Sequence, residues 1–95
     1  MRRVGLDEIL YIESVGRRIR LETECSSLFY YDKLSELAAS FDESFCRAMS
    51  SCYVNLSKVR LMSGGIVNFS CGKALVLCRD SFLKVKKEFY QYLIK

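Results

Sequence analysis

The sequence predicts a mainly β protein with minor α content: one short helix lies mid-chain and a second helix closes the chain. Apolar and polar residues alternate with a period of two in several short segments, which is typical of half-buried strands. Glycine-containing turns separate these segments, and no proline interrupts them. Apolar residues recur at helical spacing in only two places, residues 32–41 and 81–94. The 95 residues, of which 51% are hydrophobic, can bury a core and are expected to form a single domain, residues 1–95.

Seven segments have strand character. Segment 8–13 is a run of β-forming residues, and segment 19–22 alternates apolar and charged side chains. Gly16 stands between them and can adopt the positive φ that a tight turn requires. The other predicted strands cover residues 28–31, 52–56, 59–62, 66–69 and 74–77. Short glycine-containing turns separate the last three of these, which predicts two hairpins.

The two helical segments each carry an apolar face. Asp32 is a suitable N-cap for the first helix. Its apolar face consists of Leu34, Leu37, Ala38 and Phe41. Asp80 or Ser81 can cap the second helix, and the negative charge of Asp80 suits a helix N-terminus. Its apolar stripe consists of Phe82, Val85, Phe89 and Leu93.

The net charge of +4 is unevenly distributed along the chain. Residues 1–45 hold six basic and nine acidic side chains, a balance of −3, whereas residues 46–95 hold nine basic and two acidic ones, a balance of +7. Such asymmetry favours a polyanionic partner, nucleic acid above all, for the second half. The alternative is a solvated basic face with no partner.

The cysteines and the N-terminus indicate a reducing compartment. The five cysteines are an odd number without a C-x-x-C pair, so most are expected to be small core hydrophobes rather than disulfides or zinc ligands. The chain has no histidine, phosphate loop or metal-ligand cluster, so neither an enzyme nor a cofactor is expected. Asp7 and Glu8 stand where a signal peptide needs its apolar stretch. No apolar run reaches the ~20 residues of a membrane span, so the protein is expected to be cytoplasmic.

Three ordered motifs resemble those of LytTR-type DNA-binding domains. Residues 9–13 are similar to the opening strand of that family, I-x-Y-I-E. Residues 45–56 resemble its F-x-R-[V/C]-H-[R/K/N]-S-[Y/F]-[I/V]-V-N segment, with matches at Phe45, Arg47, Ser51, Val54 and Asn55. Residues 72–79 follow its G-x-x-L-x-V-S-R ending, with Leu75, Leu77 and Arg79 in place. The resemblance covers nearly the whole chain in the right order.

The chain departs from the family pattern at several positions. Met49 replaces the histidine, Ser50 the neighbouring Arg/Lys/Asn, Cys52 an aromatic residue and Cys78 a serine. The first motif also lies close to Met1, so the strand that usually precedes it in the family is expected to be absent. These changes concern DNA affinity and base choice more than the fold, because Val54, Asn55 and the apolar pattern are retained.

The resemblance implies an elongated fold of small antiparallel sheets with little helix. Family members place loops in successive major grooves of duplex DNA, often bend it, and recognise direct repeats. They usually form the output domain of response regulators in two-component systems, behind a receiver domain. Since 95 residues cannot hold a receiver as well, the chain is expected to be an isolated output domain, and a homodimer on DNA is a further expectation.

Six residues are candidates for DNA contact. Arg17 and Arg18, at a hairpin tip, can pair bidentately with guanine, although a solvated turn is the alternative for either one. Arg79 can reach phosphate or base, or form a surface ion pair with Asp80. Ser50 has a short reach and suits phosphate or water. Lys58 and Lys73 are candidate phosphate contacts or simply solvated lysines.

Two further residues are predicted to be structural. By resemblance Asn55 follows a buried strand and is expected to hydrogen-bond the backbone of a turn, while Arg47 is expected to pin the loop before Ser50.

Two rival functions remain open: a degenerate domain that binds a protein partner, and a redox-responsive regulator. The first rests on Met49 and Ser50. The second would use the thiols of Cys46, Cys52, Cys71 or Cys78.

Overall fold

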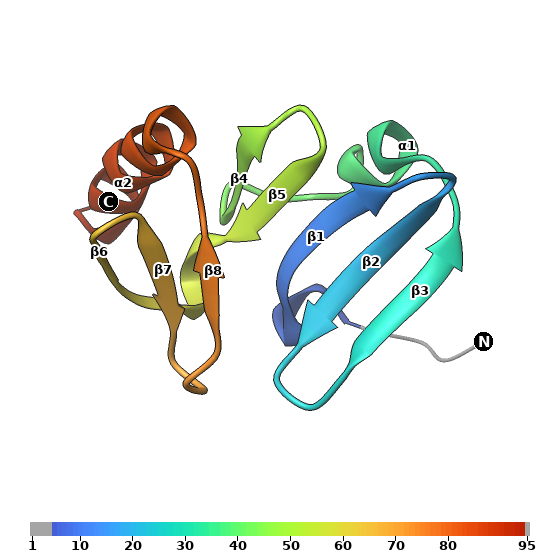
Figure 1. Ribbon diagram of the computed structural model, residues 1–95, viewed down its shortest axis with the longest axis horizontal. Coiled ribbons are helices and arrows are strands. Elements are labelled where there is room, and N and C mark those ends of the chain that lie inside the picture. Colours follow the sequence, from blue (N-terminus) through green and yellow to red (C-terminus); the bar gives the residue numbers. More distant parts are fainter. Residues whose placement is uncertain (1–4, 95) are drawn as a thin grey trace.

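Two antiparallel sheets build the protein, as a computed structural model that describes residues 5–94 shows (Figure 1). The five-stranded sheet has the order β3-β2-β1-β5-β4, and the three-stranded sheet has the order β6-β7-β8. The strands are β1 (Ile9–Val15), β2 (Arg18–Thr23), β3 (Ser27–Tyr31), β4 (Phe45–Met49), β5 (Cys52–Asn55), β6 (Val59–Ser63), β7 (Ile66–Phe69) and β8 (Ala74–Val76). The helices are α1 (Leu34–Ala38) and α2 (Arg79–Leu93), with 3-10 turns η1 (Leu6–Glu8) and η2 (Leu56–Lys58).

The architecture confirms the mainly β prediction, including all seven expected strands. An eighth strand, β4, was not predicted, because the residues around Arg47 were expected to form a loop. The molecule is elongated, with extents of 35 × 24 × 24 Å. Residues 1–4 lie outside the described residues, and so does the expectation about a strand before the first motif. Within residues 5–94, no helix combines the length and the apolarity needed to cross a membrane.

The mid-chain helix is shorter than predicted. α1 spans Leu34–Ala38 instead of 32–41, and its N-cap is Lys33 rather than Asp32. The Asp32 carboxylate instead accepts a hydrogen bond from the adjacent Lys33 N–H, at 2.8 Å, so it cannot cap the following turn in the usual way. After α1 the chain continues in tight i→i−3 turns that carry Phe41 back to the core.

The C-terminal helix begins earlier than predicted. α2 starts at Arg79 with Cys78 as its N-cap, so neither Asp80 nor Ser81 caps it. Phe82, Val85 and Phe89 are buried as expected. Leu93 was assigned to the same stripe wrongly: 60% of it is exposed, while its neighbour Tyr92 packs against the buried cluster.

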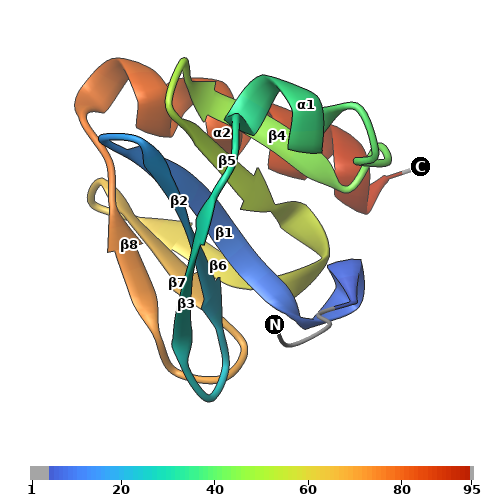
Figure 2. The same ribbon diagram turned by 90° about the vertical axis from the view of Figure 1, so that its right-hand side faces the viewer.

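The five-stranded sheet is covered on both faces. On one face, β4 and β5 pack against α2 and the small sheet, in a cluster that includes Val54, Phe69 and Val85. The opposite face carries Ile12, Leu21 and further apolar residues, and α1 covers it. Figure 2 shows α1 lying over this sheet, with the small sheet on its other side. The fold is therefore three layers deep, with the large sheet in the middle.

Asn55 links the end of β5 to the start of β1. It is 1% exposed, and its Nδ2 donates to the carbonyl of Ile9 at 2.8 Å. Its Oδ1 accepts from the backbone N–H of Ser57 at 3.1 Å and from the Ser57 hydroxyl at 2.6 Å. Asn55 thus caps η2 and ties it to the start of β1, which satisfies buried backbone groups that no strand pairs.

We expect Asn55→Ala to lower the free energy of unfolding by about 2–4 kcal/mol, because at least two buried backbone groups lose their partner at about 1–3 kcal/mol each. Ser57→Ala removes only the hydroxyl contact to Asn55 and keeps both backbone contacts, so it should cost less, about 1 kcal/mol. Urea denaturation of the two variants and the parent measures both values. Equal stability of Asn55→Ala and the parent would show that the hydrogen bonds of Asn55 do not hold this turn.

Candidate functional site

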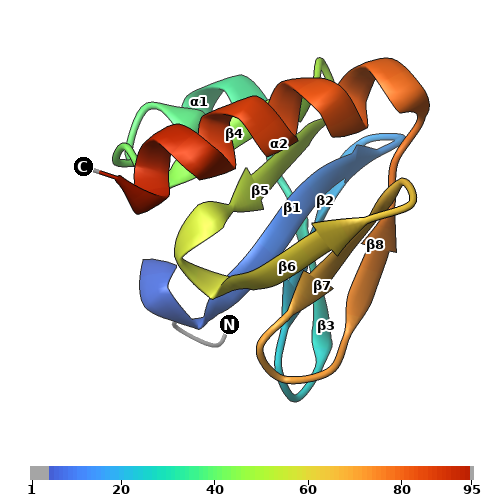
Figure 3. The same ribbon diagram turned by 90° about the vertical axis from the view of Figure 1, so that its left-hand side faces the viewer.

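Three segments that carry sequence-predicted contact residues lie at the same end of the molecule. They are the β1–β2 turn with Arg17, the β4–β5 turn with Ser50, and the start of α2 with Arg79. Figures 2 and 3, which view the molecule from opposite sides, both show the three segments at one end. Figure 1 shows them one beside another along the longest axis, with the β4–β5 turn between the start of α2 and the β1–β2 turn.

Short-range contacts fix these segments relative to one another. The backbone N–H of Ser14, at the end of β1, donates to the carbonyl of Ser51 at 2.8 Å, which ties the first turn to the second. α2 packs its buried face on β4, where Cys46 and Ala48 belong to the same apolar cluster as Val85. The start of α2 is therefore held beside the β4–β5 turn.

The three arginines at this end are exposed. Gly16 has φ +63°, which allows a two-residue turn in which Val15 pairs directly with Arg18 and Arg17 stands at the tip. The guanidinium of Arg18 lies 4.8 Å from the centre of the Phe29 ring, so a cation–π contact orients it. Arg17 and Arg79 form no ion pair with any residue from 5 to 94, and the expected alternative pair of Arg79 with Asp80 is not there.

The second turn offers less charge. Ser50 is exposed in the turn before β5, not at the start of that strand, and Met49 beside it is 37% exposed. Ser50 presents a hydroxyl without the reach or fixed charge of an arginine. Only a short neutral hydrogen bond is available from this turn.

Lys58 and Lys73 lie at the opposite end of β2 from Arg18. Lys58 Nζ is 4.0 Å from the carboxylate of Glu24, in the β2–β3 turn. Lys73 Nζ donates to the carbonyl of Thr23, the last residue of β2, at 2.7 Å. Since β2 runs from Arg18 to Thr23, about 17 Å of strand separates both lysines from the arginine end. The structure does not bring these two candidates together with the other four.

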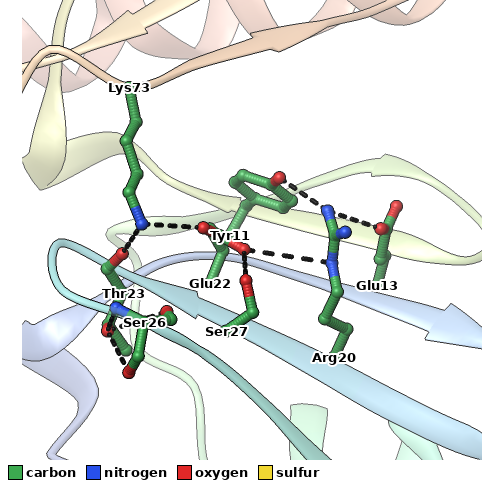
Figure 4. A network of polar contacts seen from close by, with 8 residues as sticks. All are labelled: Tyr11, Glu13, Arg20, Glu22, Thr23, Ser26, Ser27 and Lys73. Atoms are coloured by element: carbon green, nitrogen blue, oxygen red, sulfur yellow. Dashed lines mark hydrogen bonds and ion pairs between the residues drawn. The ribbon is translucent and has the colours of Figure 1, made fainter.

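A polar network surrounds Lys73 (Figure 4). Its ammonium also donates to Glu22 Oε2 at 2.8 Å, and the Ser27 hydroxyl donates to the second oxygen of the same carboxylate. Burial alone would raise the pKa of Glu22, but these hydrogen bonds outweigh it and hold the pKa below its ordinary value. The hydrogen bond with Glu22 in turn raises the pKa of Lys73. Lys73 is thus a cation with a fixed internal partner.

The structure leaves Arg47 and Arg60 exposed. The sequence predicted a structural role for Arg47 and gave no role to Arg60. Arg47 makes no hydrogen bond or ion pair with residues 5–94, so the pinning contact expected of it is not present. It is exposed because strand alternation turns it away from α2, which covers its neighbours Cys46 and Ala48. Arg60 is likewise exposed, on β6, two residues after Lys58. In the sequence, only the lack of a neighbouring acidic residue indicated that Arg47 and Arg60 form no ion pair.

The described residues offer no alternative chemical centre. No group of three or more His, Cys, Asp or Glu side chains within residues 5–94 could hold a metal ion. Two surface hollows lie near η1, far from the arginines, and both are lined by carboxylates, among them Asp7, Glu24 and Asp42. Acidic linings of this kind repel phosphate groups.

Comparison with known proteins identifies the fold and the family. A family model for the LytTr DNA-binding domain matches residues 1–90. The structure is similar to that of the LytTr DNA-binding domain of a putative methyl-accepting/DNA response regulator from Bacillus cereus, with a TM-score of 0.70 and 15% sequence identity. The match covers 92% of this chain and 84% of that one. The comparison with curated proteins gives no match.

The cysteines divide into two groups, so the expectation that most of them are core residues is wrong. Cys46 and Cys52 are buried, and burial raises the pKa of Cys46 and raises that of Cys52 to about 12. Cys25, Cys71 and Cys78 are exposed. Hydrogen bonds with the side chain and the backbone N–H of Ser81 lower the pKa of Cys78.

We expect iodoacetamide to modify Cys78 first in the folded protein, because the thiolate is the reactive form. Cys46 and Cys52 should react slower than Cys78 by on the order of a hundredfold or more, since burial both shields them and keeps them protonated. Peptide mass spectrometry over a time course measures the rates, and the same reaction in urea, where all five should react, is the control. Equal rates at Cys52 and Cys78 in the folded state would contradict this expectation.

Proposed function

The chain belongs to the LytTR family of DNA-binding domains, and we propose that it regulates transcription by binding specific duplex sites through the end of the molecule that carries Arg17, Arg18, Ser50 and Arg79. The β1–β2 turn and the start of α2 enter successive major grooves in this proposal, and the β4–β5 turn faces the backbone between them.

The observation that carries the proposal is that arginines from separate elements of the chain lie at the same end of the folded molecule. Arg17 and Arg18 come from the first hairpin and Arg79 from the start of the last helix, 61 residues later. Successive major grooves on one side of a duplex lie about 34 Å apart. These segments follow one another along the long axis of the protein, which measures 35 Å in all, and this spread supports contact with more than one part of the duplex.

Each residue type suggests a distinct role. An arginine can pair bidentately with guanine O6 and N7, and it also carries a fixed charge that attracts phosphate. Ser50 can add one neutral hydrogen bond to a phosphate. Arg47, exposed two residues before Met49, is a further candidate for phosphate contact. Lys58 and Lys73 are left out of the interface, since both lie at the far end of β2.

The likeness to the domain of a response regulator from Bacillus cereus supports a role as the output domain of a two-component system. In that setting the chain would act in the cytoplasm, behind a receiver domain, on direct-repeat promoter sites, and as a homodimer on DNA.

A second candidate function is binding of a protein partner. It is favoured by the neutral side chains of Met49 and Ser50 and by exposed aromatic rings on the edge strand β3, where Tyr31 is 84% exposed. Large exposed aromatic side chains are frequent at protein interfaces.

Titration with random-sequence duplex at several salt concentrations tests the proposal. We expect log K to fall with log salt by about 0.9 per phosphate neutralised, so that five contacts reduce affinity about 500-fold between 50 and 200 mM salt. A protein partner bound through apolar contacts would show little salt response. A flat curve, or no DNA binding at low salt, would overturn the proposal in favour of partner binding.

Single substitutions rank the contact residues. Arg18→Ala and Arg79→Ala should each weaken binding by about 1–3 kcal/mol, since each removes a charge and a base or phosphate contact. Ser50→Ala should cost less, because a neutral hydrogen bond contributes about 0.5–1.5 kcal/mol. Arg60→Ala removes the same charge at the far end of the molecule and is the matched control. The assignment is wrong if Arg60→Ala weakens binding as much as Arg79→Ala while all variants stay folded in thermal melts.

A further inference from the structure

We propose that the ion pair between Lys73 and Glu22 is a positioning pair, which sets the distance between Arg18 and Arg79 and thereby the selectivity of DNA binding. The inference rests on the proposed function and assigns Lys73 a role other than phosphate contact. It starts from the way in which the two sheets meet.

The two sheets meet mainly through apolar contacts. Tyr11 of β1 stacks on Phe69 of β7 with 5.8 Å between ring centres, and Val54 and Val67 lie in the same cluster. Such contacts attract strongly but are not directional, so they tolerate small rotations of one sheet against the other. A directional contact is needed to select one orientation.

The Lys73 ammonium supplies that directional contact. It lies in the turn between β7 and β8, yet its hydrogen bonds go to Glu22 and to the carbonyl of Thr23 in the other sheet. The Glu22 side chain is only 11% exposed, whereas that of Lys73 is 35% exposed, so the carboxylate is shielded from water and the ammonium is partly open to it. Figure 4 shows Lys73 reaching across to the strand that carries Glu22.

Glu22 is itself held in place. The Ser27 hydroxyl of β3 donates to its carboxylate, and the guanidinium of Arg20 lies 4.0 Å from the same carboxylate. Arg20 pairs with Glu13 at 2.8 Å and donates to the Tyr11 hydroxyl at 2.7 Å. The Tyr11 ring in turn stacks on Phe69 of the small sheet. The polar network therefore contacts the small sheet at two points, Lys73 and Phe69, and fixes its orientation there.

The pair lies away from both arginines along β2 and β8, so a small rotation at the pair produces a larger displacement at Arg18 and at Arg79. β2 runs from Arg18 to Thr23, so the pair sits at one end of that strand and Arg18 at the other. Lys73 directly precedes β8, which leads away from the pair towards Arg79. A rotation of ~10° about the pair would displace a point ~17 Å away, the distance to Arg18 along β2, by ~3 Å. Specific base contacts tolerate only about 0.5 Å, so selectivity depends on this contact.

Three variants separate positioning from phosphate contact: Glu22→Gln, Lys73→Gln and the double variant. The probes are a duplex enriched by the parent protein from a random-sequence pool, and the random pool itself. We expect both single variants to lower the ratio of the two affinities about tenfold. The double variant should be no worse than either one, and the salt slope should stay unchanged. Glu36→Gln, which removes an exposed charge on α1, should leave the ratio unchanged.

The rival roles give different results. If Lys73 contacted phosphate, Lys73→Gln would lower the salt slope by about 0.9 on both duplexes, and Glu22→Gln, which removes a negative charge, would not weaken binding. If the pair only stabilised the fold, folded variants would keep the parental ratio. Either result would overturn the inference.

A measurement without DNA separates this inference from the proposed function. Residual dipolar couplings of backbone amides report the relative orientation of the two sheets. One alignment tensor should fit both sheets in the parent, whereas Glu22→Gln should require a different or weaker alignment for β6–β8. A common tensor in both proteins would refute the positioning role even if DNA binding were confirmed. If the parent failed to bind duplex, the proposed function and the claim on selectivity would fail, and the alignment tensors would still decide whether the pair orients the two sheets.

Discussion

Burial of β1 on both faces is the constraint on which the rest of the structure depends. Ile9, Leu10, Tyr11 and Ile12 are all buried, although alternation along a strand would expose every second residue of a sheet with one wet face. A register irregularity between Ile9 and Tyr11 turns Leu10 and Tyr11 towards the same cluster, while Ile9 and Ile12 join the other. One strand thus requires two covering layers: α1 on one side, and the small sheet with α2 on the other.

The covering layers also decide where the arginines point. α2 returns from the small sheet to β4, so the last helix begins next to a turn of the large sheet and Arg79 joins Arg17 and Arg18. Several acidic residues of the large sheet and its turns form ion pairs within the protein. Glu13 and Glu22 face Arg20 and Lys73, and Glu24 faces Lys58. Arg17 and Arg79 have no ion pair with the described residues, so their charge is not neutralised at the arginine end.

Much of the fold was predictable because it is encoded locally. Period-two segments became strands, and Gly16 and the Gly64–Gly65 pair took the positive φ values of tight turns. Errors arose where residue type alone did not decide the contact. Asp32 has the chemistry of an N-cap but bonds to the next residue, and Leu93 fits the apolar stripe but is exposed, while Tyr92 packs against the buried cluster. Three of the five cysteines are exposed, since apolar character alone does not state which positions the layers cover.

The sequence by itself determined the fold class, the family and the residue types that can meet DNA, because these follow from periodicity and from short motifs. Only the tertiary structure decided which cations are free. In the sequence Lys73 and Arg79 are both cationic candidates for DNA contact. In the structure Lys73 forms a 2.8 Å ion pair with a carboxylate 51 residues away, whereas Arg79 forms no ion pair with the described residues. The physical reason is that a charge is neutralised by what lies within a few ångströms of it in space, and distance along the chain does not report that.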